Sequence, residues 1–195
     1  MTGLFGGAFD PPHNGHVALL AEAERRFDLE RLVVLVVAAP GHKDVWTDAE
    51  TRLELARLAL PGREVELDPH ARTIDTLRGG QWEDPLFLIG ADEFADLLSW
   101  KEPAAVLELA RLGVATRPGY PQERLEAMLR ALDHPDRVTF FEIDPVPVSS
   151  SDLRARVKRG EPIDGLVPPA VAAEIHRLGL YRGDDYTGRG NAQGD

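Results

Sequence analysis

Apolar and polar residues alternate along the chain in blocks that predict strands and helices in turn. Continuous apolar runs rich in β-branched residues, of which 31–39 is the clearest, are typical of strands buried on both faces of a parallel sheet. Stretches with apolar residues three and four positions apart predict amphipathic helices. The predicted strands cover 2–5, 31–39, 63–67, 85–89, 112–115 and 138–143. The predicted helices cover 14–27, a segment from the capping box 47–50 to Leu60, and 73–78, 93–99, 103–110, 121–132, 150–158 and 168–178.

Strands that alternate with helices predict an α/β fold, with a single doubly wound, Rossmann-like parallel sheet and helices on both faces. We expect residues 1–181 to form one domain, because 195 residues of which 43% are hydrophobic suffice for one core. The polar, Gly-rich segment 182–195 is predicted to be a disordered tail. In such sheets ligands bind beyond the carboxyl ends of the strands, where the strand order reverses.

Composition narrows the class of protein. The net charge of −11 argues against a broad nucleic-acid surface. No apolar run approaches the roughly 20 residues that span a bilayer. No signal peptide is expected either, because the N-terminus enters a predicted strand directly. The absence of cysteine excludes disulfides and thiolate metal sites. We therefore expect a cytoplasmic protein that binds small molecules and neither nucleic acid nor membrane, with an oligomeric state that the sequence leaves open.

Candidate functional residues are most concentrated in residues 6–16, whose sequence is Gly-Gly-Ala-Phe-Asp-Pro-Pro-His-Asn-Gly-His. The two glycines let the backbone bend close to a ligand, and the two prolines place the helix start after them. His13 and His16 are three apart and share one face of the first helical turn, where free N–H groups attract anions. Two imidazoles there are suited to donate hydrogen bonds to phosphoryl oxygens. The competing interpretation is a glycine-rich turn with two capping or surface histidines.

This string resembles the (H/T)-x-G-H signature of the nucleotidyltransferase superfamily. More narrowly, residues 1–181 resemble the bacterial nicotinate-nucleotide adenylyltransferases. The segments that carry the narrower match are 39–43, 73–77, 88–92 with 99–100, 116–120, 148–154, and 166–168 with 179–181. The sequence departs from the family at Gly41, where a proline is usual, at Ser151, where Thr is usual, and over 36–39, where the family has an Asn.

The resemblance implies transfer of an adenylyl group from ATP to nicotinate mononucleotide, which gives nicotinate adenine dinucleotide and pyrophosphate for NAD synthesis. The nucleophile would be a phosphate oxygen with a second pKa near 6, so no general base is needed. Catalysis then consists of holding two polyanions in line and neutralising charge as pyrophosphate departs. Cationic donors are expected, together with Mg²⁺ bound through the ATP phosphates and not by a dedicated protein site.

The resemblance assigns His16, His13 and Arg154 as the catalytic residues. His16 is expected to contact the α-phosphate, while Ser150 and Arg154 share one helix face and would hold the β- and γ-phosphates. The alternative for this last pair is an N-cap serine followed by a surface arginine. The full predicted ATP site comprises Gly6, Gly7, Phe9, His13, His16, Gly90, Asp92, Ser149, Ser150 and Arg154.

The predicted nicotinate-mononucleotide site comprises Gly7, Ala8, Lys43, Thr73, Asp92, Trp100 and Arg117. Trp100 would stack on the pyridine ring, Arg117 would pair with the phosphate, and backbone N–H groups near Thr73 would meet the carboxylate. Each has a plainer interpretation: a core tryptophan, a surface arginine, and for Asp92 a helix N-cap. Lys43, with His42, lies on a loop that would be either a mobile lid or merely solvated.

Two other function classes remain open at this point. One is another transfer enzyme of the superfamily, acting on nicotinamide mononucleotide or phosphopantetheine or transferring a cytidylyl group. The other is a nucleotide-binding module without activity, which the presence of both histidines disfavours. A class I aminoacyl-tRNA synthetase would need a longer chain and a basic surface. The remaining candidates, Asp68, His70, His134 and His176, are predicted to have no role in a site or a metal centre.

Overall fold

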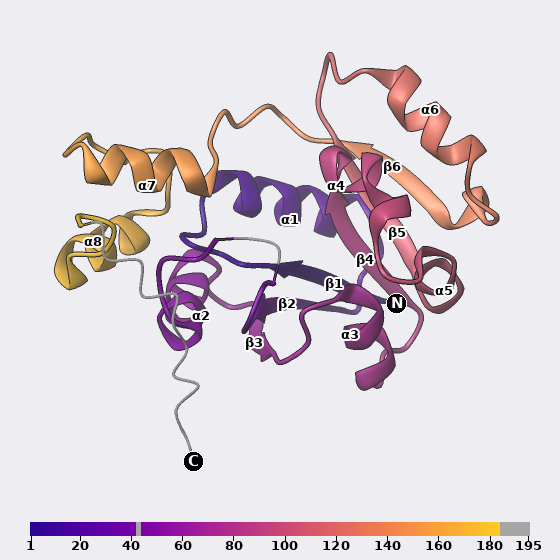
Figure 1. Cartoon of the computed structure of the whole chain (residues 1–195), viewed down its shortest axis with the longest axis horizontal. Coiled ribbons are helices and arrows are strands. Elements are labelled where there is room, and N and C mark those ends of the chain that lie inside the picture. The colour runs from indigo at the N-terminus through magenta and orange to yellow at the C-terminus, as the bar shows by residue number, and fades with distance from the viewer. Residues whose placement is uncertain (42–43, 184–195) are drawn as a thin grey trace.

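The protein is described by a computed structural model that covers residues 1–41 and 44–183. Six strands, all parallel, form one sheet in the order β3-β2-β1-β4-β5-β6 (Figure 1). The strands are β1 (Thr2–Gly7), β2 (Arg31–Val37), β3 (Glu64–Asp68), β4 (Pro85–Gly90), β5 (Arg111–Thr116) and β6 (Val138–Glu142). The strand order reverses direction between β1 and β4, which confirms the predicted doubly wound sheet.

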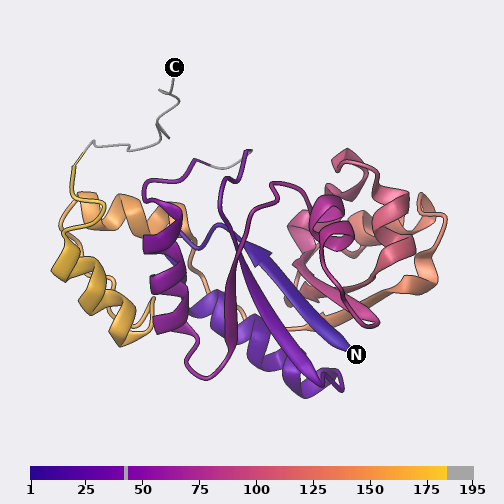
Figure 2. The same cartoon turned by 90° about the horizontal axis from the view of Figure 1, so that it is seen from below.

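Helices cover both faces of this sheet. They are α1 (Asn14–Arg26), α2 (Ala49–Ala59), α3 (Thr73–Gly79), α4 (Ala91–Ala95), α5 (Pro103–Leu109), α6 (Gln122–Arg130), α7 (Ser150–Lys158) and α8 (Pro169–Leu178), with short 3₁₀ turns η1 (Leu97–Ser99) and η2 (Pro135–Arg137). Figure 2 shows α7 and α8, in orange and yellow, beside α2 and far from the pink helices at the other end. No helix within the described ranges is long and apolar enough to cross a membrane.

Alternate residues of each strand feed two separate apolar cores. Val34 and Val36 of β2 pack with α1, α2, α7 and α8, whereas Val33 and Leu35 pack with α3, α4, α5 and α6. Side chains alternate between the two faces of a strand, so the continuous apolar run in β2 buries one set against each layer of helices. This arrangement confirms the interpretation of that run as a strand covered on both faces.

Several predicted boundaries were wrong for identifiable reasons. Strand β1 continues to Gly7 because Gly6 and Gly7 pair with Leu35 and Val36 of β2, so both glycines belong to the sheet and not to the loop. The predicted capping box was misplaced by one residue: the N-cap of α2 is Asp48, whose carboxylate accepts from the Thr51 N–H.

The predicted helix 93–99 was also wrong in extent. Helix α4 begins at Ala91, directly after the β4 strand, and ends at Ala95, and the 3₁₀ turn η1 follows it. The predicted strand 31–39 ends at Val37. Most other boundaries agree to within one or two residues. The predicted tail falls almost wholly on residues 184–195, which lie outside the described residues.

The largest fully buried side chain belongs to Arg52 on α2, which is 1% exposed. Its guanidinium donates to the carbonyl oxygens of Ala8, Val37 and Ala38 at 2.8 Å each, and its Nε donates to Thr47 O at 3.3 Å. Burial lowers the pKa of Arg52, but a guanidinium remains charged at neutral pH. One cation therefore joins the loop after β1, the end of β2 and the loop before α2.

Candidate active site

The candidate residues meet at the carboxyl edge of the sheet, on both sides of the point where the strand order reverses. Gly6 and Gly7 end β1, and Gly90 ends β4. The loop 8–13 leads from β1 into α1, and α7 approaches that loop from the distant end of the chain. Because all six strands are parallel, the loops that follow them share this edge.

The two histidines of the opening string form a stacked pair. Their ring centroids are 3.7 Å apart with an interplanar angle of 23°. His13 is the N-cap residue of α1, and its backbone N–H donates to Nδ1 of His16 at 3.1 Å. A nitrogen that accepts a hydrogen bond carries no proton, so the proton of His16 must lie on Nε2. The helix start thereby fixes His16 as a neutral donor.

His13 is neutral as well, for a different reason. Burial lowers its pKa to about 4, which leaves the ring uncharged at neutral pH. Its Nδ1 has no hydrogen-bond partner among the residues that the structure describes. A side chain at Gly15 would place a Cβ 3.0 Å from the Nδ1 and Cε1 atoms of His13, so glycine is needed there. In the free protein this pair therefore consists of neutral imidazoles, and the expected cationic donors are to be sought among other side chains.

Phe9 packs its ring against His16 of the histidine pair. Its backbone takes the left-handed conformation with φ of +53°, and its ring is 2% exposed. The ring packs edge-on against Phe5 at 5.7 Å and lies 5.0 Å from the His16 ring. A Cβ at Gly7 would come within 3.0 Å of the Phe9 ring. The side chain of Phe9 thus belongs to the core, and only its backbone can serve a ligand.

Asp10 is a buried acid in the same loop, with 1% exposure. Its Oδ1 accepts from the Thr47 hydroxyl at 2.8 Å and from the Tyr181 hydroxyl at 2.7 Å, and its Oδ2 accepts from the Trp46 N–H. Three donors from two distant segments satisfy the carboxylate. Sequence reasoning gave Asp10 no role, although an acid between a phenylalanine and a proline in a short loop is an available signal.

Side chains of helix α7 donate hydrogen bonds to backbone carbonyl oxygens of the loop 8–13. The Ser150 hydroxyl donates to Pro11 O at 2.8 Å, and Nη1 of Arg154 donates to Asp10 O at 2.7 Å. The Arg154 guanidinium also lies 5.5 Å from the centroid of the Trp46 ring. These contacts overturn the alternative of an unengaged surface arginine. The N-cap of α7 is Ser149, whose Oγ accepts from the Asp152 N–H at 3.1 Å.

Two of the predicted acceptor residues, Asp92 and Arg117, lie beside the ends of β4 and β5. The Tyr120 hydroxyl donates to Asp92 Oδ1 and to Ala91 O, both at 3.2 Å. The Arg117 guanidinium lies 4.0 Å from Asp92 Oδ2, and both side chains are more than half exposed. The N-cap interpretation of Asp92 is wrong, because Gly90 is the N-cap of α4 and Asp92 stands in the first turn.

Other residues predicted to bind the acceptor lie on different segments of the chain. Thr73 is the first residue of α3, which leaves its N–H among those that precede the first helical hydrogen bond. Trp100 is half-buried against the second apolar core, so its ring is shared between core and surface. His42 and Lys43 lie outside the described residues.

Asp68 has a structural role that the sequence did not suggest. It ends β3, is 5% exposed, and accepts from the Thr76 hydroxyl at 2.5 Å and from the His70 N–H at 2.9 Å, with His70 Nδ1 at 2.8 Å. These bonds anchor α3 to the end of β3. His134 and His176 are exposed, as predicted. No cluster of three or more potential metal ligands occurs in the part of the chain that the structure describes.

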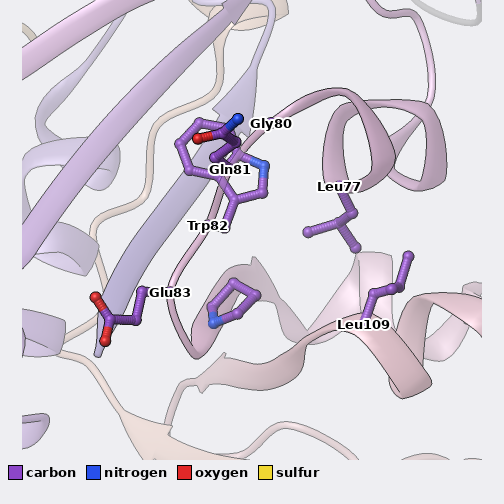
Figure 3. A pocket seen from close by; sticks show the side chains of 7 residues that line it. Leu77, Gly80, Gln81, Trp82, Glu83 and Leu109 are labelled. Atoms are coloured by element: carbon purple, nitrogen blue, oxygen red, sulfur yellow. The ribbon is translucent and has the colours of Figure 1, made fainter.

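Two surface cavities lie away from this edge. One lies at the amino end of β4, and Leu77, Trp82 and Leu109 are among its lining residues (Figure 3). The other lies between the end of α7 and α8 and includes Lys158 and His176. Neither is lined by a predicted site residue. The candidate site is identified by the polar groups that converge at the switch point.

Comparison with known proteins gives a family match over most of the chain. Residues 4–156 match the family model described as cytidylyltransferase-like. A protein of Rubrobacter xylanophilus named probable nicotinate-nucleotide adenylyltransferase is 36% identical, over 97% of this chain and 95% of its own. A protein of Thermus thermophilus with the same name is 38% identical, over 92% of this chain and 98% of its own.

Solved structures share the fold at low sequence identity. The nicotinic acid mononucleotide adenylyltransferase of Plasmodium falciparum, complexed with NaAD, superposes with a TM-score of 0.72 at 17% identity over 92% of this chain and 96% of that one. A putative nicotinate-nucleotide adenylyltransferase of Vibrio parahaemolyticus gives a TM-score of 0.57 at 18% identity, over 94% and 96% of the two chains. At these identities the likeness concerns the fold.

The lowered pKa of His13 predicts a pH-dependent stability. Between pH 6.5 and about 4 the unfolded chain takes up a proton at His13 and the folded chain does not, so the folded state loses stability as pH falls through this window. From pH 7 to pH 5 the free energy of unfolding should fall by about 2 kcal/mol more in the wild type than in His13→Gln. Urea denaturation of both proteins at both pH values measures this difference. Parallel pH dependences would show that His13 titrates normally.

Proposed function

This chain belongs to the cytidylyltransferase-like family and, within it, to the nicotinate-nucleotide adenylyltransferases, and we propose that it transfers the adenylyl group of ATP to nicotinate mononucleotide. The products are nicotinate adenine dinucleotide and pyrophosphate, so the reaction serves NAD synthesis. The observation that carries the proposal is the stacked His13–His16 pair at the start of α1, with His16 held as a donor. We further propose that residues 1–181 act as one nucleotidyltransferase domain located in the cytoplasm.

For this reaction the protein mainly has to orient the two substrates and stabilise negative charge. A phosphate oxygen of the mononucleotide attacks the α-phosphorus of ATP, and the bond from that phosphorus to the bridging α–β oxygen breaks as pyrophosphate leaves. The attacking oxygen is already ionised, so no side chain needs to remove a proton. Nε2–H of His16 donates to an α-phosphate oxygen, where negative charge builds in the transition state. A fixed tautomer serves this role because no reorganisation is needed at the moment of reaction.

The remaining ATP contacts come from the loop and from α7. Backbone groups of Gly6, Gly7 and Phe9, and the edge formed by Gly90 and Asp92, surround the nucleotide. Arg154 lies against this loop from α7, and its guanidinium is proposed to receive a β- or γ-phosphate oxygen together with Ser149 and Ser150. His13 is proposed to contribute from its place at the N-cap of α1.

The acceptor is proposed to lie along the carboxyl edge of the sheet, within reach of the segments that follow β1, β4 and β5 and of the start of α3. Arg117 holds Asp92 only at 4.0 Å and is exposed, so its guanidinium is available to a mononucleotide phosphate. Asp92, steadied by Tyr120, would accept from a ribose hydroxyl. The N–H groups of Thr73 and its neighbours, the backbone of Gly7 and Ala8, and the face of Trp100 complete the proposed acceptor site. Lys43 is proposed to act from the loop after β2.

Mg²⁺ is proposed to arrive with ATP. Such an ion neutralises charge on the departing pyrophosphate. The neutral histidines and Arg154 supply the donors that the protein itself adds.

Release of pyrophosphate with ATP and a panel of acceptors tests the proposed reaction. Turnover with nicotinate mononucleotide should far exceed that with phosphopantetheine, because Thr73, Trp100 and Arg117 are placed for a pyridine nucleotide. Nicotinamide mononucleotide should be a weaker acceptor, since it lacks the carboxylate. Equal or absent turnover with all three acceptors would refute the assignment.

Substitution of His16 tests its role in the transfer. His16→Ala removes the fixed Nε2–H donor and should lower kcat by on the order of 100-fold or more, as for other donors lost from a transition state. His134→Ala, on an exposed residue far from the loop, serves as the control and should retain full activity. Steady-state kinetics with saturating ATP and acceptor give the comparison. A His16→Ala enzyme with the wild-type kcat would remove His16 from the mechanism.

A further inference from the structure

The loop between β1 and α1 is held by the last third of the chain at several separate points. Besides the bonds from Ser150 and Arg154, the Asn14 N–H donates to Leu166 O at 3.0 Å, and Nδ2 of Asn14 donates to Gly165 O at 2.8 Å. The hydroxyl of Tyr181 reaches the Asp10 carboxylate. The contacts from Gly165, Leu166 and Tyr181 come from beyond residue 156, where the family match ends.

Tyr181 is presented to the loop by a specific backbone path. Helix α8 ends at Gly179, whose φ of +65° turns the chain, and the Leu180 N–H closes on Ile175 O at 3.0 Å. Tyr181 itself has a φ of +64° and is 5% exposed. Burial and the neighbouring Asp10 raise the pKa of Tyr181, so the hydroxyl keeps its proton and donates. A left-handed conformation at a buried tyrosine is costly and persists only where surrounding contacts enforce it.

The hydroxyl acts on a carboxylate that has few alternatives. Asp10 is almost wholly buried, and its donors are the Thr47 hydroxyl, the Trp46 N–H and the Tyr181 hydroxyl. Loss of one donor from a buried charged group leaves that group partly unsatisfied, and the loop must shift or admit water to compensate. Tyr181→Phe deletes one of these donors and keeps the aromatic ring in place.

Asp10 is connected directly to the groups assigned to the transfer. It follows Phe9, whose ring lies 5.0 Å from His16, and Phe9 and Tyr181 belong to the same apolar core. Its own carbonyl oxygen accepts from Arg154 at 2.7 Å. A displacement of Asp10 therefore moves the support of His16 and the partner of Arg154 together.

We propose that Tyr181 is a positioning residue for adenylyl transfer, whose hydroxyl sets the Asp10 carboxylate and thereby fixes the His16 ring and the Arg154 guanidinium. It does not touch the nucleotide. The proposal rests on the proposed function, because it gives Tyr181 a task in that same site. It assigns a kinetic role to the end of α8, a part of the chain that contributes no predicted substrate contact.

Tyr181→Phe tests this role, with Ile175→Val as the matched control. Both changes fall at the end of α8 on buried residues, but Ile175→Val removes one methylene and keeps the hydroxyl. Tyr181→Phe should lower kcat by about tenfold, because small misplacements of reacting groups are costly, while the KM values for ATP and acceptor change by less than about threefold. Ile175→Val should keep the wild-type kcat. Assays are run well below the Tm of each protein, which thermal denaturation establishes.

A second readout does not depend on turnover. The imidazole ¹⁵N resonances of His16 report which ring nitrogen carries the proton, and hence the bond from the His13 N–H. These resonances should shift in Tyr181→Phe and remain unchanged in Ile175→Val. An unchanged kcat and unchanged His16 resonances in Tyr181→Phe would overturn the positioning role. Equal kinetic losses in both variants would also overturn it, by showing general destabilisation. A wild-type protein without adenylyl transfer would instead contradict the proposed function, while the resonances would still test the structural link.

Discussion

The loop that leads from β1 into α1 keeps its shape through two buried charges of opposite sign. Arg52 donates to the carbonyl oxygen of Ala8 in the loop and to that of Ala38 after β2, and Asp10 accepts from the segment before α2 and from Tyr181. The negative charge of Asp10 also acts on Arg52. A buried charge is tolerated only with such complete pairing, so each of these contacts constrains the others. The positions of both histidines follow from this loop.

This construction explains how a site without charged histidines can serve a reaction of polyanions. The first turn of α1 supplies backbone N–H groups, and its N-cap bond sets the tautomer of His16. In the proposed mechanism, cationic charge comes instead from two arginines, Arg154 on α7 and Arg117 after β5, and from an ion carried by ATP. The strain at Phe9, with its positive φ, is held by the core beneath it. Neutral donors at the helix start and charged side chains on α7 and after β5 thus have separate places in the proposed mechanism.

The sequence predicted the layered fold and the location of the site more fully than its internal geometry. The apolar run of β2 and the (H/T)-x-G-H string depend on neighbouring residues, so both could be interpreted directly. The partners of Asp10 could not, because Thr47 and Tyr181 are 37 and 171 positions away. Gly6 and Gly7 have the composition of a loop, yet pairing with β2 places them in the sheet. The neutrality of His13 depends on burial, which no local pattern shows.

With the contacts of Arg52 and Asp10, the nucleotide loop is expected to be fully formed in the free protein, before any ligand binds. Amide hydrogen exchange at Trp46 tests this expectation most directly, because this N–H donates to the buried Asp10 carboxylate. We expect the Trp46 amide of the nucleotide-free protein to exchange at least about 100-fold more slowly than in an unstructured peptide. Further protection on addition of ATP should be small. Rapid exchange in the free protein, with protection that appears only when ATP binds, would contradict a preformed site.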